Sequence, residues 1–250
     1  MKRFAAALTL FTRLPLWKWM SIPGDAYSSA VVYWPLTGWL TGALTAGIYL
    51  GLSYIIPTLP ALIIAIVAQL VFTGALHEDG LADFCDGFGG GRNKDGILAI
   101  MKDSHIGTYG VIGLICYFLL LVTLLGTLPK MALALTLFAA DSFSKFTASQ
   151  IIDLLPYARK EGAKNKISYS KMSAGEFALN LLGGCIPLIP LILYRLSTTF
   201  AIIFPIIAAA LLILYMKHKI GGYTGDCCGA TALICKVMMI LGVVITLDIL

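Results

Sequence analysis

The feature that most constrains the fold of this chain is a series of long apolar stretches, with most charged residues confined to the segments between them. The 250 residues are 59% hydrophobic and only 12% charged, and the mean hydropathy is +0.89. Soluble domains carry about 25% charged residues. A chain with so little charge and so much apolar surface requires a lipid bilayer as its solvent. We therefore predict an all-α, polytopic integral membrane protein, with residues 1–250 forming a single domain.

Seven of the apolar stretches are long enough to cross or nearly cross a bilayer, and they predict a bundle of about seven transmembrane helices. Their approximate bounds are 30–55, 61–76, 111–128, 131–152, 176–194, 200–216 and 229–247. Another apolar stretch at the N-terminus ends near Arg13 and is too short to span. This stretch predicts an interfacial or re-entrant helix.

The lysine and arginine residues predict the orientation of these spans. Of the 18, 14 precede the first span or lie in the loops after the second, fourth and sixth spans, whereas only Lys130 and Arg195 lie in the alternate loops. The positive-inside rule places the rich side in the cytoplasm, and the protein in the cell membrane. Because topology explains the basic excess, the charge implies no nucleic-acid partner.

Six of the 13 acidic residues crowd into the segment after the second predicted span. Asp79, Asp83 and Asp86 have the spacing i, i+4, i+7, which places them on one face of a helix. Three such carboxylates repel each other unless a cation neutralises them, and oxygen ligands suit Mg²⁺ or Mn²⁺. We predict a Mg²⁺ site formed by these residues and Asp103, with His77 as a further catalytic candidate. A solvated acidic face is the alternative.

Polar and glycine-rich segments on the same predicted face of the membrane are expected to bind the substrate. Glycines let the backbone approach a ligand, and arginine can bind phosphate through two parallel hydrogen bonds. The candidate substrate-binding residues are Arg92, Lys102, Ser104, Arg159, Glu161, Thr224 and Asp226. A divalent metal beside such groups fits phosphoryl transfer. Because the sequence contains no Walker A or kinase motif, the predicted donor is a nucleotide-activated compound.

Charged residues inside two of the predicted spans have two explanations. Asp141 and Lys145 are four residues apart in the fourth span, and Lys236 lies in the seventh. Asp141 and Lys145 can pair on one helix face, and contact with a substrate explains them equally well. The sequence leaves both explanations open.

Motifs along the whole chain resemble those of the cobalamin synthase family, also called adenosylcobinamide-GDP ribazoletransferases. The most specific of these motifs runs from His77 to Gly87 and reads HEDGLADFCDG. The other matching segments are 11–15, 34–38, 73–74, 100–104 with Gly107 and Gly110, 157–162 and 221–226.

This resemblance implies a Mg²⁺-dependent membrane enzyme that performs the last step of nucleotide-loop assembly in vitamin B12 synthesis. A hydroxyl of α-ribazole, or of its 5′-phosphate, would attack the phosphoryl group attached to adenosylcobinamide. GMP would leave, and adenosylcobalamin or its 5′-phosphate would form. The general base stays open, because His77 and the aspartates are all candidates.

Two other functions are weighed against this one. A CDP-alcohol phosphotransferase of lipid synthesis also places aspartates at a membrane surface, but its Asp-Gly-x-x-Ala-Arg motif is not matched by residues 79–83, which lack the arginine and the spacing. A divalent-cation transporter would place its carboxylates near the middle of the membrane. Here the carboxylates follow the end of the second span.

Overall fold

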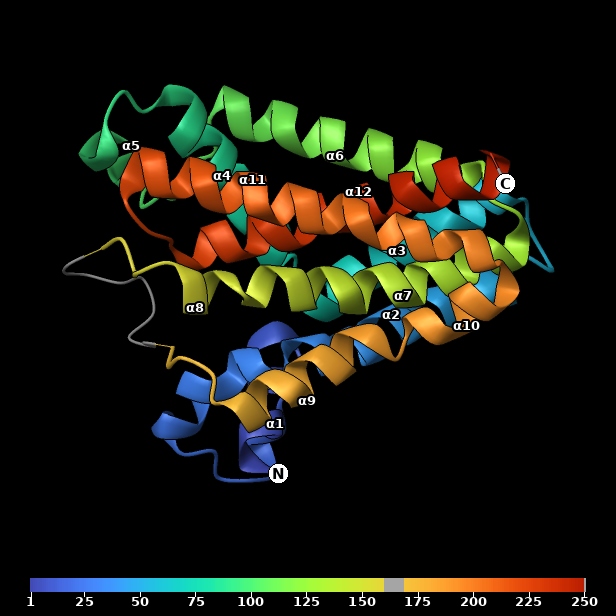
Figure 1. The fold of residues 1–250 in the computed structure, drawn as a ribbon, viewed down its shortest axis with the longest axis horizontal. Coiled ribbons are helices and arrows are strands. Elements are labelled where there is room, and N and C mark those ends of the chain that lie inside the picture. Colours follow the sequence, from blue (N-terminus) through green and yellow to red (C-terminus); the bar gives the residue numbers. More distant parts are fainter. Residues whose placement is uncertain (160–168, 250) are drawn as a thin grey trace.

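The computed structural model describes residues 1–159 and 169–249, and this part of the chain is a helical bundle without strands (Figure 1). The α-helices are α1 (Lys2–Phe11), α2 (Trp34–Leu52), α3 (Thr58–Thr73), α4 (Leu76–Gly90), α5 (Lys94–Ile100), α6 (Thr108–Gly126), α7 (Lys130–Ser149), α8 (Ile151–Leu154), α9 (Ala174–Cys185), α10 (Leu188–Tyr194), α11 (Ile203–Ile220) and α12 (Gly225–Ile249). The 3₁₀ helices are η1 (Leu16–Lys18), η2 (Gly24–Tyr33) and η3 (Leu196–Ile202).

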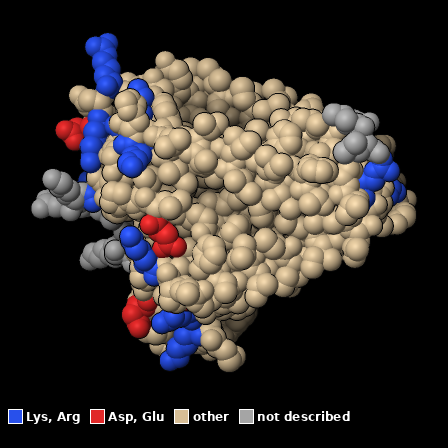
Figure 2. Space-filling view, in the orientation of Figure 1, with Lys and Arg blue, Asp and Glu red and all other residues tan. Residues whose placement is uncertain are grey.

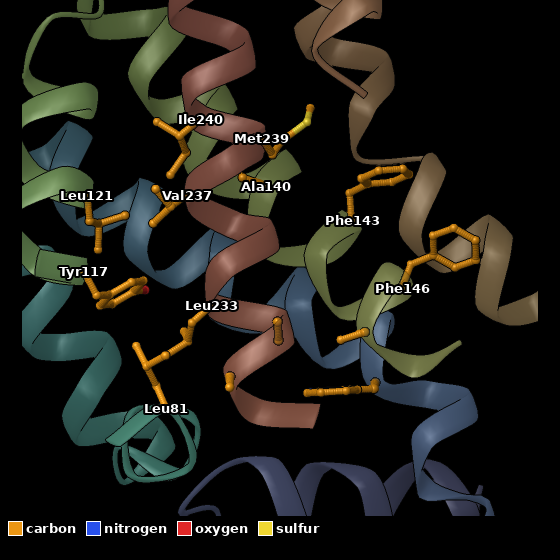
Figure 3. Close-up of a cluster of buried hydrophobic side chains, with 14 of the residues drawn as sticks. Leu81, Tyr117, Leu121, Ala140, Phe143, Phe146, Leu233, Val237, Met239 and Ile240 are labelled. Carbon is orange, nitrogen blue, oxygen red and sulfur yellow. The ribbon is translucent and has the colours of Figure 1, made fainter. Parts of the chain in front are cut away.

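Helix α12 forms the centre of the bundle. It packs against α4, α6, α7 and α11, and its apolar span is the most deeply buried of those in the described residues. In Figure 3, Leu233 of α12 points toward Leu81 of α4. One turn further along α12, Val237 points toward Leu121 of α6. This apolar contact fixes α4, which carries the acidic motif, against the central helix.

Helices α2 and α7 pack closely because α2 presents two glycines four residues apart. A Cβ atom at Gly38 would lie 2.7 Å from the Cα of Ser142, and one at Gly42 would lie 3.1 Å from the Cα of Phe138. Small residues at this spacing let membrane helices approach until their backbones touch. The pair therefore forms a tight unit beside α12.

The predicted class of multi-pass helical membrane protein is confirmed, whereas the count of seven spans is not. Four segments of the described chain are long and apolar enough to cross a membrane: Thr108–Gly126, Ala174–Tyr194, Leu196–Ile220 and Gly225–Leu247. A fifth is obtained if α3 and α4, which meet at an angle of 89°, count as one broken span.

Buried polar residues explain why two of the predicted spans differ from the others. Helices α2 and α7 have 19 and 20 residues, so their length is sufficient. However, α2 buries Thr37, Thr41 and Thr45, and α7 buries Asp141 and Lys145. Both helices thus combine the length of a span with a polar stripe that faces protein.

The N-terminal region contains the predicted short helix, which is α1. The first predicted span, 30–55, begins as an α-helix only at Trp34, because residues 24–33 form the 3₁₀ helix η2. Helix α1 packs against η2, and this contact holds the N-terminal region beside the start of α2.

Charged residues gather at the two ends of the bundle (Figure 2), with an uncharged band between them on the face shown. The outer side of α6 is apolar, and Ile112, Ile115 and Leu119 are each more than half exposed. Such a surface is disfavoured in water and suits lipid. Figure 1 places α5, the end of α8 and the α11–α12 connection together at one end, which agrees with the predicted grouping of loops.

Candidate active site

The acidic motif forms a helix of its own, α4, as its spacing predicted. A sharp turn at Gly74 and Ala75 separates α4 from α3, and both residues have left-handed φ angles, of 72° and 54°. Glycine adopts this conformation without strain, whereas alanine rarely does, so the packing around Ala75 must hold it there. The turn redirects the chain by 89° and carries α4 onto α12.

Helices α4 and α12 touch where the acidic motif begins. A Cβ atom at Gly80 would lie 3.1 Å from both the Cα and the carbonyl oxygen of Asp226. The hydrogen at this position therefore lets the two backbones meet. As a result, the residue that follows Asp79 on α4 touches Asp226 in the first turn of α12.

A pair of loops far apart in sequence is joined beside this contact. The Ala158 N–H donates to the Tyr223 carbonyl at 2.9 Å, and the Tyr223 N–H donates to the Pro156 carbonyl at 3.0 Å. A Cβ atom at Gly222 would lie 2.2 Å from the same Pro156 oxygen, so only glycine fits there. This bridge brings the next residue of the first loop, Arg159, to α12.

Arg159 and Asp226 form a largely buried ion pair. The distance from Arg159 Nη2 to Asp226 Oδ2 is 3.4 Å, and the two side chains are only 7% and 18% exposed. The Nε atom of Arg159 has no hydrogen-bond partner in the described part of the chain. The guanidinium group is thus held in place while part of its donor capacity stays unused.

These contacts surround a cavity of about 310 Å³. Four predicted site residues from three separate segments line it, namely His77, Asp79, Arg159 and Asp226. The phenols of Tyr157 and Tyr169 line it as well, and burial raises the pKa of each, so that both stay protonated and able to donate. The cavity therefore offers an anion-binding group beside two carboxylates and an imidazole.

Asp86 was predicted as a catalytic and metal-binding residue, but the structure gives its carboxylate a different set of partners. The Gly107 N–H donates to Oδ2 at 2.7 Å and the Gly110 N–H donates to Oδ1 at 2.8 Å. Asp86 is buried and does not line the cavity. Both oxygens accept from backbone N–H groups at the start of α6 that have no acceptor within the helix, and a negative charge is favoured at this end of a helix.

The four aspartates predicted to bind one metal ion are not gathered in the structure. In the described residues, no group of three or more His, Cys, Asp or Glu side chains is placed to hold a metal. A shared helix face is insufficient because each residue rises 1.5 Å, so the backbones of Asp79 and Asp86 are about 10 Å apart. Asp83 lies between them and is half-buried.

The predicted residues on the segment before α6 also lie outside the cavity wall. These residues, Arg92, Lys102, Asp103 and Ser104, are all exposed and none lines the cavity. Asp103 accepts hydrogen bonds from the ring and the backbone N–H of His105, which hold the pKa of its carboxyl group below the usual value. Their predicted contacts with substrate or metal remain predictions.

The remaining predicted substrate-binding residues are Thr224 and Glu161. Thr224 is fully buried, and its hydroxyl accepts a hydrogen bond from the Cys227 N–H at 3.3 Å, as a residue that caps a helix does. Its role in the structure is therefore to begin α12. Glu161 lies outside the residues that the structure describes.

Comparison with known proteins agrees with the sequence motifs. A family model described as cobalamin-5-phosphate synthase matches residues 3–244. The chain belongs to this family. The adenosylcobinamide-GDP ribazoletransferase of Leptospira interrogans serogroup Icterohaemorrhagiae serovar copenhageni is 35% identical, over 98% of this chain and 95% of that protein. The protein of that name from Shewanella frigidimarina is 36% identical, over 94% of this chain and 90% of its own. No solved structure gives a significant match.

Two aromatic residues to which the sequence had assigned no role also belong to the site. Phe11 and Trp34 stand in the two N-terminal motifs that resemble the cobalamin-5-phosphate synthase family, and both line the cavity. They are far from the acidic motif in sequence, so only the packing of α1 and α2 beside α4 brings them to it. Their presence in the family motifs was the signal that marked them.

The charged residues inside the predicted spans pair with each other. The Lys145 ammonium donates to Asp141 Oδ2 at 2.5 Å, and the Lys236 ammonium donates to Asp141 Oδ1 at 2.8 Å. Thr41 donates to the first of these oxygens, and the Gln69 amide donates to the second at 3.0 Å. We call these five residues the buried charge cluster. It favours the structural explanation that the sequence had left open.

Proposed function

We propose that the chain joins adenosylcobinamide-GDP to α-ribazole, or to α-ribazole 5′-phosphate. The products are GMP and adenosylcobalamin, or adenosylcobalamin 5′-phosphate. The observation that carries the proposal is the meeting of Arg159, Asp79 and Asp226 at one cavity in a member of this family. Two carboxylates beside a fixed guanidinium suit the transfer of a substituted phosphoryl group from a pyrophosphate to a hydroxyl.

The proposed reaction breaks one phosphorus–oxygen bond and forms another. A ribose hydroxyl of the riboside attacks the phosphorus that is attached to adenosylcobinamide. The bond from that phosphorus to the bridging oxygen breaks, and GMP leaves with this oxygen. The hydroxyl proton passes to a side chain at the cavity wall, where His77 and Asp79 are the candidates.

Arg159 is the proposed binding group for the phosphates. Its guanidinium is positioned by the ion pair with Asp226, so little side-chain entropy is lost when a phosphate binds. A fixed positive group also favours the extra negative charge that develops on the leaving GMP. The ion pair thus prepares the cavity for an anion before the substrate arrives.

The residues present fit a magnesium ion of the usual kind. Mg²⁺ is commonly held by one or two carboxylates, together with water and substrate phosphates, rather than by a cage of protein ligands. Asp79 and Asp226 are the carboxylates that line the described cavity, and they would hold the ion. When bound there, magnesium would neutralise the pyrophosphate of the donor.

The cavity is proposed to open on the cytoplasmic side of the cell membrane. It lies at the end of the bundle where Arg159 precedes the loop to α9 and where α12 begins. The predicted cytoplasmic loops, which hold most of the lysine and arginine residues, meet at this end (Figure 1). Water-soluble nucleotide substrates are available on that side.

A release assay tests the proposal. Detergent-solubilised protein is incubated with adenosylcobinamide-GDP, α-ribazole 5′-phosphate and Mg²⁺, and GMP is measured. We expect release that requires both substrates, and a loss of about 100-fold in kcat/KM for Arg159→Ala. Arg195→Ala, at the end of α10, is the matched control and should keep full activity. Absence of GMP release from the folded wild-type protein would reject the proposed function.

A further inference from the structure

The residues that line the cavity form two chemically different groups, which we call its charged half and its apolar half. One half carries the charged groups Asp79, Arg159 and Asp226 that the proposed function uses. The other is formed by the end of α1, by η2 and by the starts of α2 and α4, and its lining is apolar and aromatic. Its lining residues are Leu10, Phe11, Val31, Trp34 and Leu76. The proposed phosphoryl transfer uses none of these five apolar side chains.

Three rings in this region lie nearly parallel, and we call Phe11, Trp34 and His77 the aromatic wall. The centroids of Phe11 and Trp34 are 5.0 Å apart with an angle of 13° between the rings. The His77 ring lies 5.5 Å from Trp34 and 6.1 Å from Phe11, at angles of 23° and 17°. Trp34 is only 1% exposed and Phe11 only 6%, so packing from several sides holds the wall rigid and only a small part of each ring faces the cavity. Rigid, parallel aromatic groups suit the binding of a flat ring, because little order is lost on binding.

We infer that the aromatic wall binds the planar base of the attacking riboside, which is the benzimidazole ring of α-ribazole. This inference rests on the proposed function and identifies which substrate occupies which half of the cavity. With the base at Phe11 and Trp34, the ribose reaches His77 and Asp79, at the junction of the two halves. The attacking hydroxyl then lies on the side of Arg159, where the phosphates bind.

The other substrate also contains a flat base, guanine, but the lining does not suit it. Guanine carries hydrogen-bond donors and acceptors along its edge, and burying them against Leu10 and Val31 would leave most of them unpaired at a considerable cost. Only Trp34 Nε1 and His77 Nε2 are polar atoms without a partner among the described residues of this region. The benzimidazole of α-ribazole has an apolar edge, which such side chains cover well. Tyr157, which also lines the cavity, precedes Arg159 by two residues on the same loop.

The size of the cavity argues against entry of the corrin ring. Its volume of about 310 Å³ is at the lower end of the range for small-ligand pockets. A nucleoside fits a space of this size, whereas the corrin macrocycle of adenosylcobinamide does not. The corrinoid therefore remains outside, and only the phosphates of that substrate enter the charged half.

Kinetics of Phe11→Leu test the inference. Loss of an aromatic partner for a base costs about 1–3 kcal/mol, so the KM for α-ribazole should rise at least about 5-fold. The KM for adenosylcobinamide-GDP should stay within about twofold of the wild-type value. Phe200→Leu, in the exposed η3 segment, is the matched control and should change neither constant. Thermal melting of each variant in detergent confirms that it is folded.

Direct binding separates this inference from the proposed function. Calorimetry of the full-length wild-type protein with α-ribazole, without the second substrate or metal, should show binding that Phe11→Leu weakens. Val31→Thr keeps the shape of the side chain and adds a hydroxyl to the lining, so it should also weaken α-ribazole binding. It should reduce the preference for α-ribazole over the corresponding adenine riboside as well.

Three results would count against these ideas in different ways. If Phe11→Leu raises the KM for adenosylcobinamide-GDP instead, guanine occupies the wall and the inference is wrong. If Phe11→Leu and Val31→Thr are folded and leave both KM values unchanged, the wall binds no substrate. If the wild-type protein releases no GMP and binds no riboside, the proposed function itself fails.

Discussion

Replacement of Asp86 by asparagine distinguishes a metal ligand from a structural carboxylate. The side chain is 7% exposed, and it accepts N–H hydrogen bonds of 2.7 and 2.8 Å from Gly107 and Gly110 at the start of α6. An asparagine retains one acceptor oxygen, while its NH₂ group faces the second N–H donor. The variant loses one charge-assisted bond and leaves a buried donor unpaired.

The expected loss follows from these contacts. A hydrogen bond to a charged group contributes about 1.5–3 kcal/mol, and an unsatisfied buried donor costs about 1–3 kcal/mol. We therefore expect Asp86→Asn to lower the free energy of unfolding by about 3 kcal/mol. For a chain of this size, that corresponds to a fall in Tm of roughly 6–12 °C.

Thermal unfolding in detergent, combined with GMP release at a temperature well below the transition, measures both effects. Asp86→Asn should melt early and yet keep most of its turnover with an unchanged Mg²⁺ dependence. Asp95→Asn, an exposed carboxylate on α5, is the control and should change the stability by less than about 0.5 kcal/mol. If Asp86→Asn melts like the wild type but requires far more Mg²⁺ for turnover, Asp86 is a metal ligand and our interpretation is refuted.

Three other changes have defined outcomes. Gly222→Ala should lower GMP release at least about tenfold, because the alanine Cβ would collide with the Pro156 carbonyl and move the Arg159 loop away from α12. A variant with wild-type kinetics would contradict this role of Gly222. Asp141→Asn should lower the free energy of unfolding in detergent by about 3–5 kcal/mol, since it leaves two buried lysines without an anion. Lys236→Met should lower this free energy by less. If Lys236→Met is the more destabilising of the two, charge balance is not what stabilises the cluster. In a chain without its native cysteines, Asn93→Cys should react with an impermeant thiol reagent only when the cytoplasmic face is accessible, and reaction in intact cells would overturn the orientation.

The sequence was sufficient to predict the helical membrane class, the family and the helix that carries the acidic motif. It also predicted that Arg159 and Asp226, which are 67 residues apart, would approach the acidic motif, because the charge pattern put their loops on one side of the membrane. Long apolar stretches and charge asymmetry act over many residues, so their signal does not depend on side-chain detail.

The structure does not gather the four predicted metal ligands, for a reason that the sequence does not contain. Spacing places three aspartates on one helix face, but it does not say which neighbour each of them meets. Asp86 meets the start of α6, whereas Asp79 meets α12, and both neighbours come from later in the chain. Likewise, the apolar stretch 131–152 predicted a span but did not predict that other helices would bury most of α7.

The buried charge cluster makes the neutralisation of one charged helix depend on its contact with another. Helix α7 is synthesised with Asp141 and Lys145, which can neutralise each other within the helix, so this helix can enter the bilayer before the rest is made. Lys236 is made 95 residues after Asp141, in the last helix, and its charge has no partner within α12. The Lys236 charge is therefore neutralised only when α12 docks on α7. Without α12, the polar stripe of α7 would lose the Lys236 cation and the helix that covers part of it, while Asp141 would keep Lys145 as an ion partner.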